Sequence, residues 1–261
     1  MKLHGSQIRA VRPSPVFLAL LGLTAVGGAL AWRAGTETRP IAYAGVFVFV
    51  IAGWLVSLCL HEFGHAYTAW RFGDHDAQLR GYLTLNPLRY THPGLSLALP
   101  MLFIILGGIG LPGGAVYVQT SGMTPRQRTL VSLAGPVANL VLAVLLLVTT
   151  RTFGEPDHAV FWSAMAFLGF LELTAVVLNL LPVPGLDGYG ALEPHLSPAT
   201  QRAVAPFQQW GLLVLLMLLL ASPELNRRFF SLVFWFFDLF DVSPILVTWG
   251  MQLTQFWSSW F

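Results

Sequence analysis

The sequence predicts an all-α, polytopic integral membrane protein with about six transmembrane helices. Of its 261 residues, only 10% are charged and 55% are hydrophobic, and the mean hydropathy is +0.67. Soluble domains usually carry about a quarter charged residues. This chain therefore has too little charge to surround a core with a water-facing surface, and its apolar residues gather in runs about as long as a bilayer-spanning helix.

The charge and the cysteine content argue against a nucleic-acid-binding protein and against a fold held by disulfides. The formal net charge is only +2 and the basic residues are scattered, so no patch for nucleic acid is predicted. Cys59 is the single cysteine, which excludes an intrachain disulfide. The lipid bilayer is the expected environment, and nothing in the pattern indicates an oligomeric state.

The first two apolar runs predict the N-terminal helices. Residues 15–32 follow a basic N-terminus, and a retained helix is a simpler interpretation than a cleaved signal peptide. Residues 41–60 continue without a break into 61–70, which predicts a helix about 45 Å long. Because this exceeds the hydrocarbon thickness, we expect the C-terminal part of the helix near the inner membrane surface.

Three later runs predict further helices: 130–150, 159–181 and 207–221. The aromatic-rich C-terminus over 229–261 is expected either to form one more span or to lie along the membrane interface. We expect one membrane-embedded domain over residues 1–261, with a core at 41–190 and C-terminal helices at 207–261. No internal repeat or linker divides it.

A segment rich in proline and glycine, residues 95–118, separates the second and third core helices. Arg126 and Arg128 follow it, and basic residues stay in the cytosol, so we expect this segment to re-enter rather than cross. Irregular backbone is tolerated at membrane depth where it is buried in protein. Alternating residues at 83–85 and 116–118 predict a short β-hairpin there.

The chemistry is indicated by His61-Glu62-Phe63-Gly64-His65, an H-E-x-x-H pattern at the end of the long helix. Residues at i and i+4 share a helix face, so both imidazoles can reach one metal ion, and Glu62 can reach a water at that metal. Ionisable residues in a membrane helix are costly and indicate function. We predict one zinc ion per chain, with Glu62 as general base.

The third metal ligand must lie at the same depth as His61 and His65. The remaining acidic and histidine candidates are Asp74, His75, Asp76, His92, Glu155, Asp157, His158, Glu172 and Asp187. Residues 155–158 lie on the far side, and Asp74 and Asp76 are interpreted as solvated loop charges. Asp187 follows a helix that runs inward, after an unwound segment with Pro182 and Pro184, which favours it over a plain Asp-Gly turn.

Two motifs together resemble the paired signature of site-2 proteases. H-E-F-G-H is the first, and N-L-L-P-V-P-G-L-D-G at 179–188 matches the family pattern N-x-x-P-x-x-x-L-D-G. Gly135-Pro136-Val137-Ala138-Asn139 is similar to the G-P-x-x-N that opens another core helix, and residues 81–87 are similar to a stretch of short prokaryotic members. The resemblance covers roughly residues 41–190.

The resemblance implies that His61, His65 and Asp187 bind zinc and that Glu62 is the general base. It also implies that Asn179 and Asn139 lie near the substrate or the oxyanion, although interhelical hydrogen bonding is an equal interpretation of both. His92 and Glu172 depart from the residues expected at their positions, and structural roles are the simpler interpretation of both.

The predicted function is zinc-dependent hydrolysis of peptide bonds in membrane-spanning protein substrates, in a bacterial cytoplasmic membrane, with the active site near the cytosolic side. One alternative is an inactive zinc-binding protein of the same fold, against which the intact Glu62 argues. A membrane metal-dependent oxygenase or a transporter is another, but oxygenases use several histidine boxes and the sequence has one.

Overall fold

The structure is a computed structural model that describes residues 11–89 and 118–256. In this part of the chain the regular elements are all helical, as predicted. The four long helices are α2 (Pro15–Ala34), α3 (Pro40–Arg71), α6 (Pro125–Phe153) and α7 (Ala159–Asn179). The shorter ones are α4 (Asp76–Leu79), α8 (Asp187–Leu192), α9 (Pro198–Val204), α10 (Gly211–Ala221), α11 (Pro223–Asp238) and α12 (Pro244–Thr254). Single 3₁₀ turns lie at Tyr82–Thr84, Pro87–Arg89, Pro156–His158, Glu193–His195 and Ala205–Phe207.

Four of the described helices are long and apolar enough to cross a membrane: α2, α3, α6, and α7 with the turn before it. The number of candidate spans becomes five if α9 with its following turn and α10 are counted together as one broken span; these two parts meet at 63°. The six expected spans are thus not confirmed. Helices α10, α11 and α12 have only 11, 16 and 11 residues, whereas a bilayer needs about 20.

Proline and small hydroxyl residues fix where the long helices begin. Pro15, Pro40 and Pro125 each open a helix, where a missing N–H costs nothing. The Ser14 hydroxyl accepts from the Phe17 N–H, and Thr124 forms a capping box with Gln127. The start of α6 is therefore set by local sequence, just beyond the segment at 95–118.

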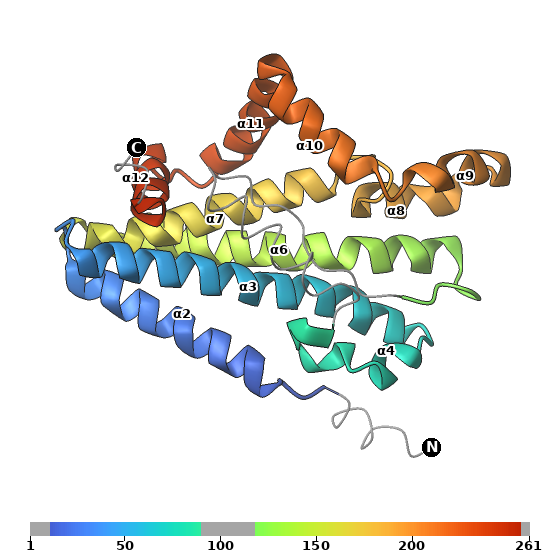
Figure 1. Cartoon of the computed structure of the whole chain (residues 1–261), viewed down its shortest axis with the longest axis horizontal. Coiled ribbons are helices and arrows are strands. Elements are labelled where there is room, and N and C mark those ends of the chain that lie inside the picture. The colour runs from blue at the N-terminus through green and yellow to red at the C-terminus, as the bar shows by residue number, and fades with distance from the viewer. Residues whose placement is uncertain (1–10, 90–117, 257–261) are drawn as a thin grey trace.

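Helix α7 is the centre of the bundle, because all its residues except Ala159 and Phe161 are buried. Helices α3, α6, α11 and α12 pack around it. Helix α2 lies against α3 (Figure 1) at a close approach of two backbones, since a Cβ at Gly27 would lie 2.4 Å from the Phe49 nitrogen. By contrast, the outer face of α6 exposes apolar side chains at Val137, Val141 and Leu145, as a lipid-facing surface requires.

Helices α3 and α6 lie side by side and run in opposite directions, so the chain returns to the end of the bundle that it left (Figure 1). A carboxylate oxygen of Asp74, just after α3, accepts a hydrogen bond of 2.8 Å from the Gln119 backbone N–H, just before α6. This pairing is what a segment that re-enters without crossing would give. The segment itself lies outside the described residues.

Two expectations about this region are wrong. Residues 83–85 are not a strand, because Tyr82–Thr84 forms a 3₁₀ turn and Leu85 has a positive φ of 56°. Three alternating residues are too short a signal to distinguish a strand from buried packing, and Leu83 is in fact buried. Of the piece at 116–118, all but residue 118 lies outside the described residues. Asp74 is not a solvated loop charge, since it is 5% exposed.

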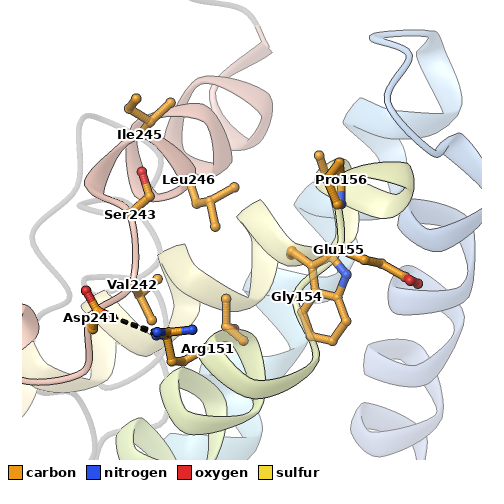
Figure 2. A pocket seen from close by; sticks show the side chains of 12 residues that line it. Arg151, Gly154, Glu155, Pro156, Asp241, Val242, Ser243, Ile245 and Leu246 are labelled. Carbon is orange, nitrogen blue, oxygen red and sulfur yellow. Dashed lines mark hydrogen bonds and ion pairs between the residues drawn. The ribbon is translucent and has the colours of Figure 1, made fainter.

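A cavity of about 330 Å³ lies at the other end of the bundle, where α6 ends and α7 begins (Figure 2). An ion pair between Arg151 and Asp241, 2.8 Å long, borders it. None of the predicted metal-site residues lines this cavity. It is therefore a feature of the opposite end of the molecule from the H-E-x-x-H pattern.

The fold makes a topological prediction that cysteine labelling can test. In a Cys59→Ser background, cysteines at the exposed positions Asp76 and Thr124 should react with a membrane-impermeant reagent from one side of the membrane. A cysteine at Glu155 should react only from the other side. The Cys59→Ser protein alone, which should stay unlabelled, is the control. Labelling of positions 124 and 155 from the same side would contradict this arrangement of α6.

Candidate metal centre

His61 and His65 lie one turn apart near the end of α3 and present their Nε2 atoms to the same space. The two nitrogens are 3.1 Å apart, and both side chains are buried. Gly64 between them allows the backbone of α6 to come close, because a Cβ there would lie 2.7 Å from the Ala134 carbonyl oxygen. The motif thus supplies two nitrogen atoms that can bind a metal ion. Its glycine also provides the space into which α6 packs.

Asp187 reaches the same space from the first residue of α8. A tight turn after α7 turns the chain back, with Gly185 at a φ of +93° that favours glycine. The Asp187 carboxylate oxygens lie 3.3 Å from Nε2 of His61 and 3.3 Å from Nε2 of His65. A side chain from a distant part of the sequence thus joins the pair of histidines.

Helix α6 holds α8 in place at this point. The Thr129 hydroxyl donates to the Ala191 carbonyl at 2.8 Å, and Arg128 pairs with Glu193 at 3.4 Å. A Cβ at Gly190 would meet the Ser132 hydroxyl at 2.9 Å. The position of Asp187 therefore depends on contacts along the first turns of α6.

The three side chains fit a tetrahedral zinc site. With metal–ligand distances of 2.0–2.1 Å, two ligand atoms of a tetrahedron lie about 3.4 Å apart. The observed separations of 3.1, 3.3 and 3.3 Å are close to that edge length. Among the described residues, these three form the one group of histidine, cysteine and acidic side chains able to hold a metal ion.

Gly135 leaves open the space in front of the two imidazoles. A Cβ at this position of α6 would lie 2.3 Å from Nε2 of His65 and 2.6 Å from Nε2 of His61. Zinc–nitrogen distances are about 2.0–2.1 Å, so this Cβ would occupy the place of a bound ion. The absence of a side chain at Gly135 is a second, independent indication of a metal-binding site.

The other ring nitrogens of both histidines face acceptors on α6. Nδ1 of His65 lies 2.7 Å from the Val131 carbonyl oxygen, and Nδ1 of His61 is hydrogen-bonded to Oδ1 of Asn139. Since an oxygen acceptor requires the proton on Nδ1, Nε2 of each neutral ring is left with its lone pair free for a metal.

The Asp187 carboxyl group is in the form that binds a cation. Burial alone would raise its pKa, but the neighbouring His65 and His61 hold the pKa of Asp187 well below its ordinary value. The group therefore carries a negative charge at neutral pH. Two imidazoles that have released the proton from Nε2, together with one carboxylate, form a zinc ligand set found in hydrolases.

Known proteins similar to this chain bear the name zinc metalloprotease. Residues 49–155 match peptidase family M50. The chain is 69% identical to the proposed zinc metalloprotease Rip2 of Mycolicibacterium smegmatis over 97% of both chains, and 69% identical to Rip2 of Mycobacterium tuberculosis over 98% of both. It is 33% identical to the proposed zinc metalloprotease YwhC of Bacillus subtilis over 65% of this chain and 79% of that one. No solved structure gives a significant match.

The chain belongs to peptidase family M50, the site-2 proteases. The matched region begins within α3 and ends just after α6. It thus includes the H-E-x-x-H pattern, Gly135 and Asn139, whereas Asp187 lies beyond it. The resemblance seen in the sequence is confirmed at the level of the family.

In this M50 member, Asn139 lies behind the metal site. Its Nδ2 donates to a carboxylate oxygen of Glu172 at 2.7 Å and to the Ser57 hydroxyl at 3.0 Å, while its Oδ1 faces His61. The amide is thus engaged with protein groups on three sides, which agrees with the interhelical interpretation. Asn179, the last residue of α7, is buried, and a role near the oxyanion stays a prediction for it.

The remaining candidates are not part of the His61, His65 and Asp187 group. His158 is at the opposite end of the bundle, where its ring stacks on Trp32 and its Nδ1 lies 2.9 Å from the Trp32 carbonyl oxygen. Glu172 is buried in α7 and contacts Asn139, and His92 lies outside the described residues. Glu62, which follows His61 in α3, is 4% exposed.

Sequence reasoning missed Ser57, whose hydroxyl donates to Glu172 at 2.6 Å. A signal for it was present, since Ser57 lies four residues before His61 and therefore on the same face of α3. The carbonyl of Val131 carried no signal, because any residue type supplies a backbone oxygen.

Gly135→Ala should abolish zinc binding in this M50 protein although every proposed ligand is retained. The added methyl group would occupy the metal position, so we expect the zinc content of purified protein to fall at least about 10-fold. Gly22→Ala in α2 is the matched control, because the Cβ it would add meets no atom within 4 Å apart from the local backbone of its own helix. Full zinc content in Gly135→Ala would show that the ion binds elsewhere.

Proposed function

We propose that this chain is a zinc-dependent endopeptidase that hydrolyses peptide bonds of membrane-spanning protein substrates. The observation that carries the proposal is the convergence of His61, His65 and Asp187 on one small space beside Gly135. Membership of peptidase family M50 supports it, as do relatives that bear the name zinc metalloprotease.

His61, His65 and Asp187 would hold the ion, and three protein ligands leave a fourth position open, as in catalytic zinc sites. Bound zinc would supply Lewis acidity, which acidifies water and polarises a peptide carbonyl. Glu62 adjoins the first histidine on the same turn of α3, and its carboxylate would accept the proton from the attacking water. A protein that only binds zinc has no need of such a buried base.

The proposed location is a bacterial cytoplasmic membrane, with the metal centre near the cytosolic side. Arg71 ends α3, Arg80 and Arg89 follow it, and Arg126 and Arg128 lie in the first turn of α6, so five arginines lie near the metal end of the bundle. Arg33, Arg39 and Arg151 lie at the opposite end. The excess of positive charge at the metal end supports a cytosolic position for it.

The alternative functions receive less support. An oxygenase or desaturase with two metal ions would need two clusters of metal ligands. Residues 11–89 and 118–256 contain a single such cluster. An inactive zinc-binding relative would share the same donor set, so the role of Glu62 is what separates it from a protease.

Glu62→Gln should retain about one zinc ion per chain and lose cleavage of a model transmembrane substrate. The amide keeps the size of the carboxylate but cannot take a proton, and the loss of a general base costs about 100-fold or more. Metal analysis and a cleavage assay on detergent-solubilised protein measure both. Glu155→Gln, exposed at the opposite end, is the control. Full activity in Glu62→Gln would refute the protease mechanism.

Asp187→Ala should lose zinc as well as cleavage, because two protein ligands remain where a catalytic zinc normally has three. We expect zinc content well below one ion per chain, measured by the same metal analysis. Asp157→Ala removes an exposed acidic residue far from the site and should keep both properties. Near-stoichiometric zinc with wild-type cleavage in Asp187→Ala would disprove the ligand assignment.

A further inference from the structure

Glu172 is a carboxylate buried in the central helix of a membrane protein. It is 1% exposed and lies in the second half of the apolar α7, two turns before its end. Burying a charged group at this depth is costly unless hydrogen bonds satisfy it. The structure gives it two donors, the Ser57 hydroxyl at 2.6 Å and Nδ2 of Asn139 at 2.7 Å, and both reach the same oxygen, Oε2.

These contacts set the direction of every hydrogen bond in the cluster. Ser57 donates its proton to Glu172, so its oxygen accepts from Asn139 at 3.0 Å. Asn139 therefore uses both hydrogens of its amide nitrogen on Glu172 and Ser57. Its oxygen is left to face Nδ1 of His61, which must be the donor.

An amide can be turned by 180° with almost no change of shape, so something must fix its orientation. In the turned state, Oδ1 of Asn139 would face the carboxylate of Glu172, and two acceptors would repel each other. The amide nitrogen would then face Nδ1 of His61, which could only accept. In a neutral ring this places the proton on Nε2, the atom that faces His65 and Asp187.

We propose that Glu172 is a positioning residue, which holds the amide of Asn139 so that His61 donates from Nδ1 and presents an unprotonated Nε2 to the metal. This inference rests on the proposed zinc site. His65 needs no such residue, because its Nδ1 faces the backbone carbonyl of Val131, an acceptor that cannot be turned. The two histidines thus reach the same state by different means, and only His61 depends on a buried acid.

Zinc affinity is the first test. Glu172→Gln keeps the size of the side chain but offers both a donor and an acceptor, so it no longer discriminates between the two orientations of Asn139. We expect the zinc dissociation constant, measured by chelator competition on purified protein in detergent, to rise about 10-fold, the lower end for a residue behind a metal ligand. Glu172→Asp retains the carboxylate and should recover part of this loss.

Thr174→Val is the matched control, because Thr174 is buried on the same helix and its hydroxyl donates to the Phe170 carbonyl four residues before. Its zinc affinity should equal that of the wild type. A 10-fold loss of affinity in Glu172→Gln together with wild-type affinity in the control supports the proposal. Equal losses in both variants would mean that Glu172 only stabilises α7, which overturns it.

A second measurement needs no metal. In apo protein labelled with ¹⁵N-histidine, the His61 resonances, assigned by their disappearance in His61→Gln, report which nitrogen carries the proton. We expect the proton on Nδ1 in the wild type and a clear Nε2-protonated population in Glu172→Gln. An unchanged tautomer would overturn the proposal.

The two measurements also separate this inference from the proposed function. If the wild-type protein bound no zinc, the zinc site would be wrong, and the tautomer of His61 in the apo protein would still decide the role of Glu172. If the wild type bound zinc and Glu172→Gln bound it equally well with the same tautomer, only the role of Glu172 would be wrong.

Discussion

The structure depends on one constraint, which is that a cluster of polar side chains must be satisfied inside an apolar bundle. Water is scarce at this depth, and each buried polar group without a partner costs free energy. His61, Asn139 and Glu172 come from three different helices, and each is nearly fully buried. Their hydrogen bonds therefore fix the positions of α3, α6 and α7 relative to one another. Apolar packing alone would fix these positions less specifically, because the hydrophobic attraction between side chains has no preferred direction.

Helix α6 is the platform for the metal centre because of a stripe with a spacing of four residues. Val131, Gly135 and Asn139 lie on successive turns of one face. The first binds His65 through its carbonyl, the second leaves room for an ion, and the third binds His61. Because α3 runs in the opposite direction, the earlier α6 residue meets the later histidine. The antiparallel pairing and the stripe together explain why both imidazoles present Nε2 to the same space.

Much of this could be predicted from sequence where the signal is local. The long helices follow from apolar runs and H-E-x-x-H from helix geometry, while the placement of Asp187 followed from depth and from an unwound turn. Signals that depend on tertiary contacts were harder to see. The strand expected at 83–85 rested on three residues, and a 3₁₀ turn serves the same buried packing. The partners of Glu172 could not be predicted, because they lie 33 and 115 residues away on separate helices.

Hydrolysis inside a membrane protein also requires that water reach a site built from buried groups, and the three proposed ligands differ in this respect. The side chains of His61 and His65 are 8% and 10% exposed, whereas that of Asp187 is 22% exposed. The histidines belong to a long membrane-spanning helix, but Asp187 opens the short α8, outside the candidate spans. The proposed metal centre thus lies where the long apolar helices are followed by shorter ones. The α3 and α6 side supplies the two more deeply buried ligands, and the α8 side supplies the most exposed of the three.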